Sequence, residues 1–189
     1  KLFLGVSLVA LSLLSLTTTA ATPDVANAAM RGDKAKITAL LAQKADVNAS
    51  QPDGSTALHW AAYRQDVEMA NLLIRAGANP KTPTLDGATP LSLASANGNA
   101  ALITALIKAG ANPNEKLPTG KTNLMLASKN GNVDGIRALI DAGADVNAKE
   151  DLRGTTALMW AADEGHPAAL KLLIERDADV KARSKAAAR

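Results

Sequence analysis

The apolar positions of this chain return in the same order at a fixed interval. A phrase in which a threonine precedes a leucine and one or two alanines begins four times, at spacings of 33, 33 and 34 residues. Its copies begin at Thr56, Thr89, Thr122 and Thr156. A period of this length indicates a stack of equivalent units rather than one fold around a central core.

Each period predicts a helix, a turn, a second helix and a polar loop. The threonine is placed at a helix N-cap, where its hydroxyl can accept from a free backbone N–H, and the first helix is expected over about residues 57–64. The second helix is expected over about residues 67–75, with its apolar residues at helical spacing. Three of the second helices are expected to end at a glycine in the left-handed C-cap conformation, namely at Gly77, Gly110 and Gly143.

Two segments carry a resemblance to a known family. One is Asp53-Gly54-Ser55-Thr56-Ala57-Leu58-His59-Trp60-Ala61-Ala62, and the other is Gly143-Ala144-Asp145-Val146-Asn147-Ala148. With a leucine-containing helix between such segments, the pattern resembles the ankyrin repeat over about residues 23–182. The resemblance implies an all-α repeat fold, an ankyrin solenoid of about five helix-turn-helix units with projecting β-hairpin loops.

The repeat domain is expected over residues 22–183. Its units, numbered one to five, cover about residues 23–50, 51–83, 84–116, 117–150 and 151–183. The first unit lacks the threonine phrase and resembles an N-terminal capping repeat. Residues 184–189 are expected to form a frayed tail or the start of a missing repeat. The second possibility leaves open that the repeats are a fragment of a larger protein.

Four departures from the family pattern carry expectations of their own. Gln65 stands where the family has a glycine between its helices, and Asn123 stands where it has a proline. Asp177 replaces the C-cap glycine of the last unit, which should weaken that helix end by up to about 1 kcal/mol. The extra residue of the last spacing is expected in a loop, near residues 151–153, where an insertion costs little.

The N-terminal segment differs from the repeats. Lys1 precedes an almost wholly apolar run from Leu2 to Leu16, and small residues follow. This order predicts a secretory signal peptide over residues 1–21, cleaved after Ala20 or Ala21, and hence export to the periplasm or exterior of a bacterium. The run is shorter than the ~18 to 20 residues that span a bilayer comfortably. An uncleaved membrane anchor is the alternative.

Composition excludes several kinds of site. The chain has no cysteine, which excludes disulfides, thiolate metal sites and cysteine nucleophiles. The formal net charge is only +3, and the sign of charge changes along the repeats, so no nucleic-acid partner is expected. No glycine-rich phosphate loop is present. We therefore expect no cofactor, no metal and no small-molecule substrate.

Few residues suggest chemistry. For His59 the resemblance implies a structural role, with hydrogen bonds to nearby backbone and hydroxyl groups, rather than a catalytic or metal-binding one. Asp163 and Glu164 are the nearest candidates for acid–base work, but they are expected to be exposed at a helix end. Trp60 and Trp160 occupy equivalent positions, where we expect core packing rather than binding hot spots. An enzyme would require a pocket that holds His59 together with two acids.

The resemblance also implies that a partner protein binds the concave side, formed by the ends of the first helices and the loop tips. The candidate partner-binding residues are Tyr63, Arg64, Asn97, Lys121, Lys129, Asn130, Arg153, Asp163 and Glu164. Tyr63 and Arg64 stand out because tyrosine and arginine are enriched at hot spots. The expected protein is a non-catalytic, monomeric protein–protein interaction module. The alternatives are a repeat fragment that docks an adjacent domain and a repeat array displayed on a membrane.

Overall fold

The computed structural model describes residues 22–185, and the predicted signal peptide and residues 186–189 lie outside that range. The described part contains ten α-helices and no β-strand. Their bounds are α1 Asp24–Arg31, α2 Lys34–Ala42, α3 Ala57–Tyr63, α4 Val67–Arg75, α5 Pro90–Asn97, α6 Ala100–Lys108, α7 Asn123–Lys129, α8 Val133–Asp141, α9 Ala157–Asp163 and α10 Pro167–Glu175.

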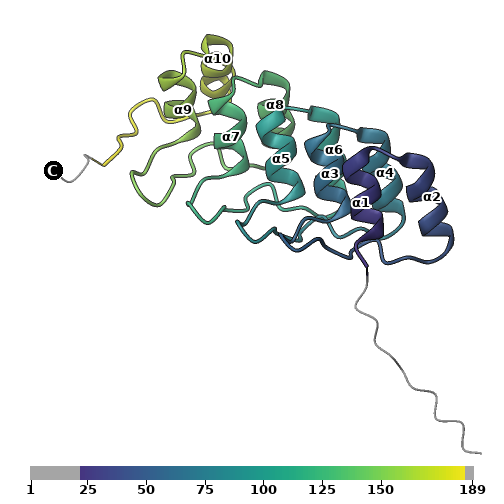
Figure 1. The fold of residues 1–189 in the computed structure, drawn as a ribbon. Helices are drawn as coiled ribbons and strands as arrows, with labels where there is room; N and C mark the ends of the chain where they lie inside the picture. Colours follow the sequence, from purple (N-terminus) through teal and green to yellow (C-terminus); the bar gives the residue numbers. More distant parts are fainter. Residues whose placement is uncertain (1–21, 186–189) are drawn as a thin grey trace, which may run out of the picture.

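The helices stack in pairs, as Figure 1 shows. The odd-numbered helices pack against one another in sequence from α1 to α9 and form one layer. In the second layer α4, α6, α8 and α10 pack against one another in the same way. The loops between successive pairs all project from one side of the stack. The predicted all-α fold of stacked helix-turn-helix units is confirmed.

Equivalent apolar residues build one continuous core along the stack. Leu58, Leu91 and Leu124 occupy the same position in successive odd-numbered helices, and none is more than 1% exposed. In the second layer Leu106 and Leu139 are both fully buried. All five belong to a single cluster of buried residues that runs through every unit. No unit therefore buries its apolar face without its neighbours.

Side-chain caps mark where most of the helices begin. Thr89, Thr122 and Thr156 each accept a hydrogen bond from the backbone N–H three residues later, as the sequence predicts. Three second helices are capped in the same way, by Asp33 before α2, Asp66 before α4 and Asn99 before α6, whereas α8 and α10 have no side-chain cap bond. Each cap satisfies an N–H that the helix itself leaves unpaired.

Within residues 22–185, three residues other than glycine adopt left-handed backbone conformations. Gln65 has φ of 57° and Asp177 has φ of 65°, as expected of residues that replace glycines, and Lys44 is a third case with φ of 60°. A side chain in this conformation costs roughly 1–2 kcal/mol per residue. The backbone is therefore strained at these three positions, and a glycine there would relieve the strain.

The loops end in tight turns rather than in extended strands. In the second, third and fourth units a backbone N–H bonds to a carbonyl four residues later, as from Gln51 to Ser55 at 2.9 Å. The described residues contain one isolated antiparallel bridge, between Lys116 and Thr122. In the loop that leads into the fifth unit, the closing bond runs from the Glu150 N–H to the Thr155 carbonyl, five residues later. The extra residue lies in this loop, as predicted.

Asparagines join most successive units along the loop bases. The side chains of Asn48, Asn114 and Asn147 each donate to a carbonyl in the next unit, at 3.1, 2.8 and 3.0 Å. Each also accepts from a backbone N–H of that unit, at 2.8, 2.7 and 2.8 Å. Lys81 stands at the equivalent position between the second and third units. That junction therefore lacks both side-chain hydrogen bonds.

The last helix pair leaves part of its apolar surface uncovered. Ile174 is 51% exposed, although the equivalent Ile74, Ile107 and Ile140 are partly buried against the core. Beyond α10 the chain returns to the last loop, where the Lys185 N–H donates to the Arg153 carbonyl at 2.7 Å. Leu85 makes the same bond to Asp53 at 2.9 Å, across the same 32-residue separation. Residues up to 185 thus follow the path of a further repeat loop.

Candidate partner-binding face

The loops and the odd-numbered helices together form one face of the stack, here called the loop–helix face. It corresponds to the side that is predicted from the sequence to be concave and to bind a partner. Two pockets open on it. The first, the Trp60 pocket, has a volume of about 510 Å³, and the second, the Trp160 pocket, has a volume of about 460 Å³. Both lie where a repeat carries tryptophan in its odd-numbered helix.

Three of the predicted binding residues form hydrogen bonds with the neighbouring unit through their side chains. The Arg64 guanidinium donates to the Met30 carbonyl at 3.4 Å. The Asn97 amide donates to the Tyr63 carbonyl at 3.5 Å, and the Asn130 amide donates to the Ala96 carbonyl at 3.1 Å. These side chains satisfy carbonyls at the end of the preceding odd-numbered helix. They remain exposed, so they can still contact a partner, but they also hold the stack together.

The Trp60 pocket is mainly apolar and aromatic. Tyr63 is 64% exposed and meets Trp60 edge to face, with ring centroids 5.9 Å apart. Leu85, at the tip of the next loop, is 83% exposed. The complete lining is Asp53, Ser55, His59, Trp60, Tyr63, Thr84, Leu85, Asp86, Ala88 and Leu93. The pocket spans the second and third units.

His59 is buried, and its hydrogen bonds fix its tautomer. Its Nδ1 lies 3.1 Å from the backbone nitrogen of Thr56, which can only donate, so Nδ1 is the acceptor. Nε2 therefore carries the proton and donates to the Ala88 carbonyl of the next unit at 3.2 Å. Burial lowers the pKa of His59. The expected structural role, which joins two units, is confirmed.

The two acids beside His59 are also engaged by their own loops. The backbone N–H and the hydroxyl of Ser55 donate to Asp53, each at 2.9 Å, and lower the pKa of its carboxyl. The Thr84 hydroxyl donates to Asp86 and lowers its pKa in the same way. The pocket thus gathers a histidine and two acids, the combination that would favour an enzyme. Both ring nitrogens of His59 are hydrogen-bonded within the chain, to the backbone of Thr56 and of Ala88.

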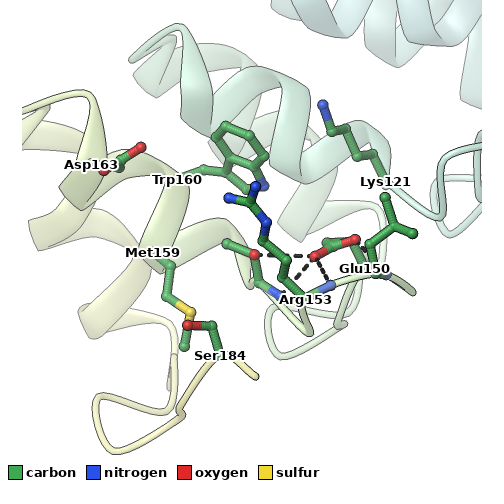
Figure 2. A pocket seen from close by; sticks show the side chains of 9 residues that line it. Lys121, Glu150, Arg153, Met159, Trp160, Asp163 and Ser184 are labelled. Carbon is green, nitrogen blue, oxygen red and sulfur yellow. Dashed lines mark hydrogen bonds between the residues drawn. The ribbon is translucent and has the colours of Figure 1, made fainter. Parts of the chain in front are cut away.

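The Trp160 pocket combines an indole with cations (Figure 2). The Lys121 ammonium lies 4.8 Å from the Trp160 ring centroid, and the Lys129 ammonium lies 5.3 Å from it. Lys121 and Asp163 lie on opposite sides of the indole. The lining is Lys121, Glu150, Leu152, Arg153, Thr155, Met159, Trp160, Asp163 and Ser184. The pocket therefore brings together three predicted binding residues, Lys121, Arg153 and Asp163.

Glu150 closes the last loop from inside. It is only 6% exposed, and its carboxylate accepts from the backbone N–H groups of Leu152 at 2.7 Å and Arg153 at 2.6 Å. The N–H and hydroxyl of Thr155 donate to the same carboxylate at 3.3 and 3.1 Å (Figure 2). Burial alone would raise the pKa of Glu150, but these hydrogen bonds outweigh it and lower the pKa.

This inward turn of Glu150 changes the surroundings of the nearby tryptophan. In the second unit the equivalent Gln51 accepts from the Trp60 indole N–H at 2.7 Å. The carboxylate oxygens of Glu150 instead accept hydrogen bonds from residues of its own loop. The buried Trp160 indole N–H therefore has no hydrogen-bond partner among the described residues. The two tryptophans therefore differ in chemistry although they occupy the same helix position.

The predicted acids Asp163 and Glu164 are exposed at the end of α9, as expected. Glu164 lies 3.9 Å from the Lys129 ammonium in the preceding unit. Among residues 22–185, no three histidine, cysteine, aspartate or glutamate side chains are grouped so that they could hold a metal ion. None of the helices in that range is long and apolar enough to cross a membrane. The segment predicted to be a signal peptide, with an uncleaved anchor as the alternative, lies outside that range.

The family profile described as ankyrin repeats (3 copies) matches residues 25–117 and, a second time, residues 91–184. The chain belongs to the ankyrin repeat family. A search of curated proteins found no match to it. Ankyrin repeats are generally protein–protein interaction modules and are typically non-catalytic.

Several exposed residues of this ankyrin surface are not among those predicted from the sequence. Leu85 and Leu152 are 83% and 76% exposed at the tips of two loops that are separated by the loop of the fourth unit. In each case an apolar residue inside a turn signal was the sign that could have found it. Trp60 and Trp160 do pack against the core, as expected. Neither indole is fully buried, however, and each lines a pocket on the loop–helix face.

Proposed function

We propose that this ankyrin protein binds a partner protein through its loop–helix face and catalyses no reaction. One observation carries the proposal. Tyr63, Leu85 and Leu152 are large, strongly exposed apolar side chains, and all three border the two pockets of this face. Exposed apolar side chains around pockets with polar rims are typical of protein-binding sites.

The scaffold favours binding with little reorganisation. The pockets are formed by helices whose caps and inter-unit hydrogen bonds are already in place, so few side chains must be ordered on binding. Tyr63 and Trp60 already support each other through their edge-to-face contact. Affinity would then depend on a few anchors in each pocket and on complementary charge around them.

We further propose that the protein acts as a monomer outside the bacterial cytoplasm, in the periplasm or the medium. The apolar N-terminal segment and the small residues that follow it support export. N-terminal sequencing of the protein from fractionated native cells tests this proposal. A mature chain that begins near residue 22 supports cleavage, and an intact apolar segment in the membrane fraction supports an anchor. Light scattering of the purified repeats measures the oligomeric state.

Photo-crosslinking from single positions tests the binding face. A photoreactive amino acid placed at Leu85 probes the loop–helix face, and the same amino acid at Arg137 on α8 serves as a control outside it. We expect Leu85 to capture a partner protein in native extracts and Arg137 to capture none. Equal capture from both positions, or capture from Arg137 alone, would refute the proposed face.

A second role is supported by the uncovered surface of the fifth unit. Ile174 is half exposed, and the chain up to Lys185 already follows the path of a repeat loop. This end surface would accept a further helix pair from an adjacent domain. A photoreactive residue at Ile174 distinguishes the roles, because capture from Ile174 without capture from Leu85 would favour docking at the end of the stack.

A further inference from the structure

The charges around the Trp60 pocket are one-sided. Asp53 and Asp86 are the charged residues of its lining, and none of the residues that line it is a lysine or an arginine. The remaining walls are largely apolar or aromatic, with Tyr63 and Leu85 the most exposed. An apolar wall beside two carboxylates matches the two halves of a basic side chain, a long apolar stem and a charged head.

Both carboxylates are held in place and keep capacity for another donor. They occupy equivalent positions in successive loops, and each is fixed by a hydroxyl of its own loop, Ser55 or Thr84. These bonds lower the pKa of both carboxyls, which are therefore ionised near neutral pH. Because a carboxylate oxygen has two lone pairs, each group can accept from an incoming ammonium or guanidinium as well.

The other tryptophan shows that an indole at this helix position is open to cations. The ammonium groups of Lys121 and Lys129, both in the preceding unit, lie over the Trp160 ring at 4.8 and 5.3 Å from its centroid. The positions equivalent to these lysines in the first unit are Thr22 and Met30, neither of which is charged. Within the described part of the chain, the cation–π contacts are confined to Trp160, and Trp60 makes none.

We propose that the Trp60 pocket receives a lysine or arginine side chain of the partner protein. The stem of that residue lies against Tyr63 and Leu85, and its head meets the carboxylates of Asp53 and Asp86. An acidic residue would be repelled there, and a purely apolar one would strip water from two charges without replacing it. The proposal rests on the proposed function, because it names the residue that the loop–helix face recognises.

Peptide titration tests this recognition directly. The probe is acetyl-Gly-Leu-Arg-Leu-Gly-amide, and its control replaces arginine with citrulline, which has nearly the same shape and no charge. Replacing Trp160 by phenylalanine leaves Trp60 as the single tryptophan of the chain and thus as a fluorescence reporter. The indole N–H signal of Trp60 in an NMR spectrum of the unaltered protein provides a second readout that needs no substitution.

We expect the arginine peptide to bind about tenfold more tightly than the citrulline peptide, with an advantage that shrinks as salt is added. A double variant, Asp53→Asn with Asp86→Asn, retains amide oxygens for the Ser55 and Thr84 hydroxyls but should lose most of this preference. Asp134→Asn is the matched control, because Asp134 is an exposed acid on α8 outside the pocket. Equal binding of both peptides, no binding of either, or an unchanged preference in the double variant would overturn the proposal.

The two proposals can fail separately. If Leu85 captures a partner protein and the double Asp53 and Asp86 variant captures it equally well, the recognition of a basic residue is wrong and the binding face stands. If capture does not depend on the loop–helix face, the proposed function itself fails. A third comparison uses free arginine amide. If it binds as tightly as the arginine peptide, the pocket recognises a small cation and not a residue of a partner protein.

Discussion

The junction between the second and third units lacks the asparagine hydrogen bonds of the other three junctions, and one substitution should add them. Lys81 occupies the position where three other junctions carry an asparagine. Its backbone N–H bonds to the Asn79 side chain at 3.0 Å, the same local turn that precedes Asn114. An asparagine at residue 81 should therefore reach the next unit without any change in the backbone. We predict that Lys81→Asn stabilises the protein.

The magnitude follows from the two bonds that the asparagine would add. Its side-chain N–H would donate to the Gly110 carbonyl, and its side-chain oxygen would accept from the Asn112 N–H. The Asn112 N–H has no backbone partner among the described residues. Each such bond contributes about 0.5–1.5 kcal/mol net, and both would be partly exposed to water. After loss of the lysine stem that now lies over Gly110, we expect a gain of about 1–2 kcal/mol in the free energy of unfolding.

Urea unfolding followed by tryptophan fluorescence measures this gain. With slopes of about 1–3 kcal/mol per molar urea, the midpoint should rise by roughly 0.5 M. Trp60 and Trp160 lie on opposite sides of the junction, so single-tryptophan versions report each part separately. Since the new bonds link the two parts, their midpoints should also move closer together.

Lys181→Asn is the matched control for this prediction. Lys181 has the same local turn, with its N–H 2.9 Å from the Asp179 side chain, but no unit follows it among the described residues. It should therefore leave stability unchanged. If Lys81→Asn fails to raise the midpoint, or Lys181→Asn raises it equally, the asparagines do not act by joining units.

Four further predictions concern burial, strain and pH. Leu106→Ala, in a fully buried position, should cost about 2–5 kcal/mol, whereas Tyr63→Ala should cost less than about 1 kcal/mol and weaken partner binding. Asn123→Pro should stabilise the protein by about 1–3 kcal/mol, because it removes a buried amide that has no partner at a helix position suited to proline. Asp177→Gly should add roughly 0.5–1 kcal/mol by relieving a left-handed residue. Since burial lowers the pKa of His59, the unfolded state binds its proton first, so stability should fall as pH drops below about 6.5; His59→Ser should flatten that part of the profile.

Thermal and urea unfolding measure all four, and each has its own contradicting result. A loss in Tyr63→Ala as large as that in Leu106→Ala would mean that the faces are assigned wrongly. Destabilisation by Asn123→Pro would show that the buried amide is satisfied. No gain from Asp177→Gly would show that the helix end tolerates aspartate. An unchanged pH profile in His59→Ser would place the acid sensitivity elsewhere.

The sequence predicted the parts of this fold that repeat. Threonine caps, glycine turns and leucines at helical spacing return every 33 or 34 residues, so each unit supports the interpretation of the next. Comparison of the repeat spacings also predicted that the extra residue of the last unit lies in its loop. It also identified Gln65 and Asp177 as residues in glycine positions, and both have left-handed backbones.

Features of the site that depend on side-chain direction could not be predicted. The sequence gives no sign that the Asn97 and Asn130 amides turn back to carbonyls of the preceding unit. The two tryptophans align with leucines in the other units, which suggested burial, whereas the fold leaves part of each indole on the surface. Contacts across 30 or more residues decide these points, and single-sequence periodicity does not report them.

The single added residue in the fifth loop has a consequence beyond that loop. In this loop Glu150 accepts hydrogen bonds from its own backbone, whereas the equivalent Gln51 accepts from the Trp60 indole, and the Trp160 indole N–H has no partner among the described residues. One added residue thus goes with a change in the hydrogen bonds beside the tryptophan, while the helices keep their order in the stack. In repeat proteins of this kind, changing the length of a single loop offers a route to new specificity that leaves the packed layers untouched.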